Sequence, residues 1–126
     1  MRASLLGLKK EDRLAIDALM HRLFDEVGQQ IVLIELFGSK ARGDDRPESD
    51  IDVAVVVSQR DWPLEHRIHT ISARVSLEHD VVFNLYVVDQ TRWLWMGKIR
   101  HPLYRSILAE GVELAPALMA APLPPL

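Results

Sequence analysis

Three short apolar runs, each of strand length and rich in β-branched residues, constrain this chain more than any other feature of its sequence. They span residues 31–37, 51–57 and 81–88. Apolar runs of this length that are bounded by polar or glycine-containing segments favour buried strands over helices. The sequence therefore predicts a sheet at the centre of the molecule.

Helical periodicity fills the segments around these runs. Residues 10–27 and 63–78 each repeat apolar side chains at spacings of three and four, which is typical of an amphipathic helix packed on a core. Residues 89–110 are also predicted to be helical, with a break near Pro102, because a proline disfavours helix in the residue before it. Gly111 is expected to end the last helix.

The predicted order is helix, strand, strand, helix, strand and helices, which indicates an α/β (α+β) fold: a small mixed central sheet flanked by helices. The connection between the first two strands permits either a parallel or an antiparallel pair. Residues 1–115 are expected to form one domain, because a chain of 126 residues without a wide linker is about one domain long. Residues 116–126 carry four of the seven prolines and no charge, and are predicted to be a flexible tail.

Bulk composition excludes several classes of protein. The net charge of −3 gives no strong nucleic-acid signal, although one nucleotide can still bind through local donors and a metal. The absence of cysteine excludes disulfides and thiolate metal sites, and it fits a reducing compartment. No apolar stretch is long enough to span a membrane, and no signal peptide is evident, so we expect a cytoplasmic protein.

The segment between the first two predicted strands carries the chemistry. The first strand ends in Gly38 and Ser39, where a short helical turn is expected to begin. Glycine lets a backbone N–H approach a ligand closely, and amides at a helix start together with a serine hydroxyl form a site for phosphate oxygens. Lys40 and Arg42 add positive charge beside this turn.

An acidic pair, Asp50 and Asp52, follows at the entry to the second strand. Alternation along a strand puts both carboxylates on one face, about 6–7 Å apart along the chain. Two such carboxylates repel each other, and a divalent cation between them removes that penalty. Mg²⁺ prefers carboxylate oxygens combined with substrate phosphates. Two successive strands therefore predict a phosphate site beside a metal-binding pair.

A third carboxylate would complete a two-metal site of the kind that clamps the attacking and leaving oxygens in phosphoryl transfer. Asp80 is the candidate, because it comes just before the third predicted strand and can reach the same sheet edge if that strand lies beside the second. Asp89 lies at the far end of the third strand and is better placed to cap the following helix.

These residues carry a family resemblance. Gly38-Ser39, ten intervening residues and then Asp50-Ile51-Asp52 resemble the signature of the DNA polymerase β-type nucleotidyltransferase superfamily. The surrounding sequence looks like the minimal nucleotidyltransferase (MNT) branch of that superfamily, and residues 107–114 are similar to its usual C-terminus. The resemblance covers roughly residues 10–114, and it implies a polymerase β-like nucleotidyltransferase core.

The resemblance also implies roles for the site residues. Gly38 and Ser39 would bind the β- and γ-phosphates of a nucleoside triphosphate, with Arg42 as a further phosphate contact. Asp50 and Asp52 would hold two Mg²⁺ ions, and Asp80 would bind one of them and help to deprotonate an acceptor hydroxyl. That hydroxyl would attack the α-phosphorus, and pyrophosphate would leave.

Minimal members of the branch imply a partner. Many are the antitoxin half of a two-gene module whose other half is a helical toxin of the HEPN family. The resemblance then implies transfer of AMP from ATP to a tyrosine of that toxin. Two alternatives stay open: an antitoxin that is catalytically weak or inactive and neutralises its partner by binding alone, and a small-molecule nucleotidyltransferase of the aminoglycoside-modifying kind.

Overall fold

The computed structural model describes residues 8–44, 46 and 49–114. The predicted tail at residues 116–126 lies outside this part of the chain. In order, the elements are α1 (Lys10–Val27), the 3-10 helix η2 (Gly28–Gln30), β1 (Ile31–Phe37), α2 (Gly38–Arg42), β2 (Ile51–Val57), α3 (Trp62–His79), β3 (Phe83–Asp89), α4 (Gln90–Lys98), α5 (Pro102–Glu110) and β4 (Val112–Glu113).

The sheet is mixed, as the sequence predicted. Its strand order is β3-β2-β1-β4. The pair β1 and β2 is antiparallel, with Phe37 opposite Asp52. The pair β2 and β3 is parallel, with Asp52 beside Asn84. The short strand β4, which pairs antiparallel with β1, was not predicted, because two residues are too few to set a periodic pattern.

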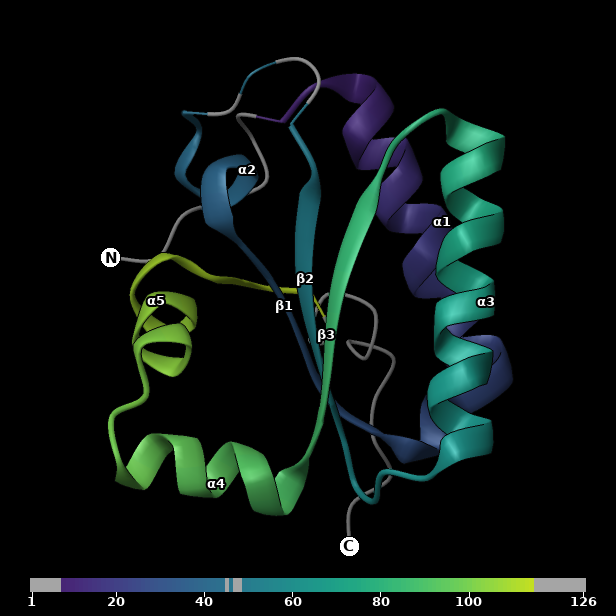
Figure 1. Ribbon diagram of the computed structural model, residues 1–126. Coiled ribbons are helices and arrows are strands. Elements are labelled where there is room, and N and C mark those ends of the chain that lie inside the picture. Colours follow the sequence, from purple (N-terminus) through teal and green to yellow (C-terminus); the bar gives the residue numbers. More distant parts are fainter. Residues whose placement is uncertain (1–7, 45, 47–48, 115–126) are drawn as a thin grey trace, which may run out of the picture.

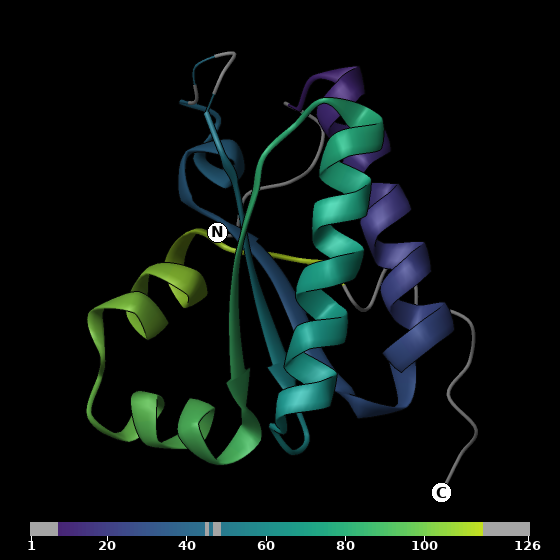
Figure 2. The ribbon, with the colours of Figure 1, turned by 45° about the vertical axis from the view of Figure 1, so that its right-hand side comes forward.

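Helices cover both faces of the sheet (Figures 1 and 2). The pair α1 and α3 packs on one face, and α2, α4 and α5 lie on the other. Alternate residues of β2 divide between them, because successive side chains of a strand point to opposite faces. Ile51, Val53, Val55 and Val57 enter the large core under α1 and α3. Ala54 enters a smaller core with Phe37 and Ile107 under α4 and α5.

Helix and strand boundaries match the sequence-based expectation closely, with one informative difference. The third strand begins at Phe83 rather than at residue 81. Asp80 adopts the left-handed conformation (φ 53°, ψ 47°) and ends α3, with its N–H bonded to the Ser76 carbonyl. The expected role of Asp89 as a helix cap is confirmed: its Oδ1 accepts a hydrogen bond of 2.7 Å from the Arg92 amide at the start of α4.

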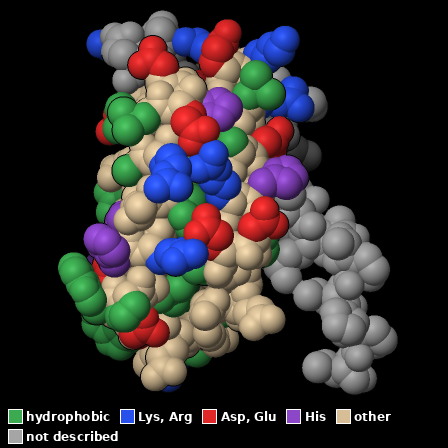
Figure 3. All heavy atoms as spheres, turned by 90° about the vertical axis from the view of Figure 1, so that its right-hand side faces the viewer, with side chains coloured by type: hydrophobic (Ala, Val, Ile, Leu, Met, Phe, Trp, Pro, Cys, Tyr) green, Lys and Arg blue, Asp and Glu red, His purple; other side chains and the backbone are tan. Residues whose placement is uncertain are grey.

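The outer face of α1 and α3 carries interleaved charges of both signs (Figure 3). Cross-helix ion pairs join Arg22 to Glu78 at 2.8 Å and Arg67 to Glu26 at 2.7 Å. Opposite charges that alternate in this way give no basic stripe of the kind that tracks a nucleic-acid backbone. No helix among the described residues is long and apolar enough to cross a membrane.

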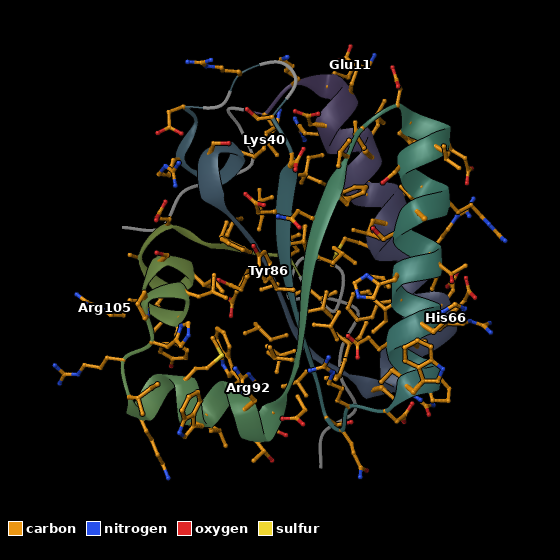
Figure 4. The ribbon with its side chains drawn as sticks, in the orientation of Figure 1. Glu11, Lys40, His66, Tyr86, Arg92 and Arg105 are labelled. Atoms are coloured by element: carbon orange, nitrogen blue, oxygen red, sulfur yellow. The ribbon has the colours of Figure 1, made fainter. Side chains whose placement is uncertain are left out.

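A buried ion pair joins α2 to α1. Lys40 Nζ lies 2.7 Å from Asp12 Oδ2, and the two residues are 2% and 6% exposed. Figure 4 places Lys40 between α2 and the first turns of α1. The sequence indicated only that Lys40 adds positive charge beside the Gly-Ser turn, and in the structure its ammonium group is directed to Asp12. The pair therefore fixes α2, the turn that follows β1, against the N-terminal part of α1.

We expect Asp12→Ala to lower the free energy of unfolding by about 3 kcal/mol, because it leaves the Lys40 ammonium buried without this carboxylate. Urea-induced unfolding measures the change. The matched control is Glu78→Ala, which breaks the exposed pair with Arg22 and should cost less than about 1 kcal/mol. Equal costs for the two variants would contradict a structural role for the buried pair.

Candidate active site

The site begins where β1 turns into α2. Gly38 has a φ of +76°, which glycine adopts at little cost and other residues adopt under strain. A Cβ at this position would overlap Asp52 Oδ2 and lie 3.1 Å from Asp52 Cγ. The absence of a side chain at Gly38 is therefore what lets the turn approach the carboxylate. The structure thus brings Gly38 and Asp52 together.

Ser39 lies in the first turn of α2, directly after this glycine, and is half-buried. Its carbonyl accepts hydrogen bonds from the amides of Gly43 at 2.9 Å and Asp44 at 3.2 Å, which close the short helix. The role of its hydroxyl as a phosphate donor stays a prediction.

Asp50 and Asp52 meet at the entry to β2. Asp50 is exposed and Asp52 is half-buried. Burial raises the pKa of the Asp52 carboxyl above its ordinary value; a hydrogen bond from Asn84 opposes the rise, and the negative charge of Asp50 adds to it. The two carboxylates are thus close enough to repel each other, as expected for a pair on one strand face.

Arg42 is tied to two carboxylates. Its Nη1 lies 2.7 Å from Glu110 Oε2 on α5, and its Nε lies 3.1 Å from Asp44 Oδ2. These hydrogen bonds raise the pKa of the Arg42 guanidinium. The positive charge of Arg42 also acts to lower the pKa of Asp52, so the guanidinium lies near the acidic pair. In this structure Arg42 links α2 to α5, and its contact with a phosphate stays a prediction.

Asp80 does not join the acidic pair. It ends α3 three residues before β3 begins, whereas the strand position beside Asp52 belongs to Asn84. In residues 8–44, 46 and 49–114, no group of three or more His, Cys, Asp or Glu side chains could hold a metal ion. The strand register thus puts Asn84, and not Asp80, beside the pair, and the catalytic role expected of Asp80 stays a prediction.

Three residues that contact the site had no signal in the sequence. Asp12 holds Lys40, Glu110 holds Arg42, and Asn84 donates its Nδ2 hydrogen to Asp52 Oδ1 at 3.1 Å. Each comes from an element distant in the chain, so spacing alone could not find it. Only the register of β3 against β2 would have singled out Asn84.

The oxygen donors present fit a magnesium ion. Two carboxylates that repel each other, one of them beside a turn with no side chain in the way, form a donor set that a divalent cation stabilises. Mg²⁺ is usually held by one or two carboxylates together with substrate phosphates. Asp50 and Asp52 would supply the carboxylates, and the Gly-Ser turn lies directly beside Asp52.

Comparisons with known proteins agree with this geometry. A family model described as polymerase beta nucleotidyltransferase matches residues 21–95, which include the Gly-Ser turn and the acidic pair. The Methanocaldococcus jannaschii protein named "Putative protein adenylyltransferase MJ0604" is 34% identical over 97 residues, covering 77% of this chain and 91% of that protein. A second protein of that organism, "Putative protein adenylyltransferase MJ0141", is 39% identical over 57 residues, covering 44% of this chain and 58% of its own.

Solved structures share the fold. One is a toxin–antitoxin crystallised with AMP-PNP, at 22% identity and a TM-score of 0.53, covering 79% of this chain and 71% of that chain. Another is a mutant of the toxin–antitoxin MntA-HpeT, at 18% identity and a TM-score of 0.51, covering 84% and 73%. The chain belongs to the polymerase beta nucleotidyltransferase family and is a nucleotidyltransferase. The expected fold class and superfamily are confirmed.

We expect Gly38→Ala to weaken binding of AMP-PNP with Mg²⁺ by about tenfold or more and to destabilise the protein by more than about 1 kcal/mol, because the new Cβ meets Asp52 in a left-handed backbone. Titration calorimetry and urea unfolding measure the two effects. Gly43→Ala is the matched control: its φ is +82°, but a Cβ there meets nothing within 4 Å. Gly43→Ala should show only the destabilisation that comes from a left-handed backbone, with unchanged AMP-PNP affinity. Equal changes in affinity and in the free energy of unfolding for the two variants would refute the close approach of Gly38 to Asp52.

Asp52→Asn should stabilise the metal-free protein at neutral pH. A raised pKa means that the folded state binds the proton more tightly, so the free energy of unfolding falls as pH rises from the ordinary value of 3.8 through the folded value. We expect a gain under about 1 kcal/mol, because the carboxylate is partly exposed.

Thermal unfolding in EDTA at pH 7 and at pH 3 measures the effect, which should vanish at the lower pH because both states are then protonated. Asp25→Asn, on the exposed face of α1, is the control and should leave Tm unchanged. A lower Tm for Asp52→Asn at pH 7 would show that the Asp52 carboxylate stabilises the metal-free fold, contrary to the expected destabilisation.

Proposed function

We propose that this nucleotidyltransferase transfers AMP from ATP to a hydroxyl group of a partner protein in a Mg²⁺-dependent reaction. The single observation that carries the proposal is the close approach of the Gly38 turn to Asp52, which brings the Gly-Ser turn beside the Asp50–Asp52 pair. The preference for AMP is supported by two relatives named as protein adenylyltransferases.

Each residue has one task in this reaction. Asp50 and Asp52 would hold Mg²⁺, which supplies charge to neutralise the phosphate oxygens. The Ser39 hydroxyl would donate to a β- or γ-phosphate oxygen, beside the open backbone of Gly38. Arg42 would hold α2 against α5 through Glu110 and keep positive charge near the phosphates.

The chemical step is a displacement at the α-phosphorus. A bond forms between the acceptor oxygen and the α-phosphorus while the bond from that phosphorus to the bridging oxygen breaks. Pyrophosphate leaves with the bond electrons, and the proton of the acceptor hydroxyl is released to solvent. Catalysis of such a step consists mainly of positioning and charge stabilisation, which is what a rigid turn and an acidic pair provide.

The partner that we propose is a HEPN-family toxin, with a tyrosine as acceptor, so that the chain acts as an antitoxin. Two proteins that share its fold were crystallised as toxin–antitoxin pairs, one of them with an ATP analogue.

A second candidate is an antitoxin that acts by binding alone. The observation that favours it is the amide of Asn84 beside Asp52, where a third carboxylate would be needed to complete a two-metal site. The two candidates differ in whether neutralisation of the partner leaves a covalent mark.

The deciding experiment mixes the purified chain with its helical partner, Mg²⁺ and ATP labelled at either the α- or the γ-phosphate. We expect label from α-labelled ATP only, and a gain of one or more AMP in the intact mass of the partner, with peptide mapping locating a tyrosine. The Asp50→Asn/Asp52→Asn double variant should abolish transfer while still binding the partner.

Asp25→Asn is the matched control and should transfer AMP normally, because Asp25 lies on the exposed face of α1, away from the site. Neutralisation of the partner without any mass change, in both the wild type and the double variant, would favour the binding-only antitoxin. Transfer of the γ-label would exclude AMP transfer altogether.

A further inference from the structure

The sheet allows only two in-register neighbours for Asp52. Phe37 lies opposite it on β1, and Asn84 lies beside it on β3. Paired residues on neighbouring strands point to the same face, so these two side chains flank the carboxylate on the side of α4 and α5. Phe37 is aromatic and packs against Tyr86 in a tilted arrangement, with ring centroids 5.6 Å apart. Asn84 is therefore the position from which the sheet itself could supply a third ligand to the acidic pair.

The hydrogen bond between Asn84 and Asp52 fixes how the carboxylate is used. A carboxylate accepts hydrogen bonds only, so the 3.1 Å contact has the Asn84 amide as donor and Asp52 Oδ1 as acceptor. The other oxygen, Oδ2, faces the open backbone of Gly38. Asn84 thus occupies one oxygen of Asp52 and leaves the other directed to the turn where phosphates are expected.

Among the described residues, no group of three His, Cys, Asp or Glu side chains could hold a metal ion, so no other carboxylate takes the third place beside the pair. Asp80 ends α3 and lies outside the β2–β3 pairing, and Glu110 is held by Arg42 at 2.7 Å. Figure 4 shows that Tyr86, the next residue of β3 on this face, projects from the strand toward α4 and α5. The next β3 position on this face therefore carries an aromatic ring and not a carboxylate. The side chains around Asp52 are therefore one further carboxylate, that of Asp50, and the neutral amide of Asn84.

We propose that this centre holds one divalent cation with the nucleotide, instead of the two that the sequence predicted, and that Asn84 is the residue that limits it to one. Two carboxylates and the phosphates can complete the shell of a single Mg²⁺, but a second ion would need a further carboxylate beside Asp52. Asn84 acts as a positioning residue through Asp52. This inference rests on the nucleotide site of the proposed function.

The test counts metal ions directly. Equilibrium dialysis of the full chain against Mn²⁺ and AMP-PNP gives the ratio of bound metal to bound nucleotide. We expect about one Mn²⁺ per nucleotide for the wild type and about two for Asn84→Asp. This substitution replaces the side-chain amide by a carboxylate of nearly the same shape and so supplies the third carboxylate. A wild-type ratio of two, or a ratio that stays at one in Asn84→Asp, overturns the proposal.

Two control variants separate the carboxylate from other effects of substitution. Asn84→Ala removes the hydrogen bond without adding charge and should keep the ratio at about one. Asp80→Asn should also keep that ratio. A second ion in Asn84→Ala, or a loss of the bound ion in Asp80→Asn, would each contradict the assignment of Asn84 as the limiting residue.

A measurement without nucleotide keeps this inference separable from the proposed function. Asn84→Asp should lower the Kd for Mn²⁺ alone by about tenfold or more, because a third negative ligand joins the set. An unchanged Kd contradicts the proposal even if AMP transfer is observed. If the wild type transfers AMP, Asn84→Asp should raise the rate of transfer. If neither the wild type nor any variant transfers AMP, the proposed function fails, but the ratio of bound metal to nucleotide still decides the role of Asn84.

Discussion

The antiparallel pairing of β1 with β2 is the constraint on which the rest of the site depends. It puts Phe37, the last residue of β1, opposite Asp52, so that the segment leaving the first strand and the segment entering the second lie at one edge of the sheet. Gly38 then follows Phe37 directly and meets the carboxylate without a side chain between them. A parallel pair would have separated these two segments by the length of a strand.

The site costs stability, and the remainder of the fold offsets that cost. Two carboxylates close together, one of them half-buried, repel each other in the absence of a cation, and the left-handed backbone of Gly38 tolerates no other residue easily. The large core under α1 and α3 and the buried pair of Lys40 with Asp12 hold the site from the opposite side. Active sites commonly carry such destabilising features, because the ligand relieves them when it binds.

The two faces of the sheet therefore have different tasks. The face under α1 and α3 is packed with aliphatic side chains, and its outer surface pairs charges of opposite sign. The face toward α2, α4 and α5 carries only a small core and leaves Asp52, Asn84 and Tyr86 at least partly exposed. Aliphatic packing fills the first face, so the acidic pair is directed to the second.

The sequence by itself determined the elements and the two halves of the site. Periodicity located α1, β1 and β2 with the bounds that the structure has, because long apolar stripes and short β-branched runs depend on local spacing alone. The Gly-Ser turn and the Asp50–Asp52 pair were evident for the same reason, since each lies within a few residues of a strand end.

Tertiary structure decided what lies beside them. The register of β3 against β2 placed Asn84, and not Asp80, next to Asp52, and the packing of α1 and α5 on α2 directed Lys40 to Asp12 and Arg42 to Glu110. These contacts join residues between 28 and 68 positions apart. No local pattern specifies such pairs, because strand register and helix packing follow from how the whole core closes.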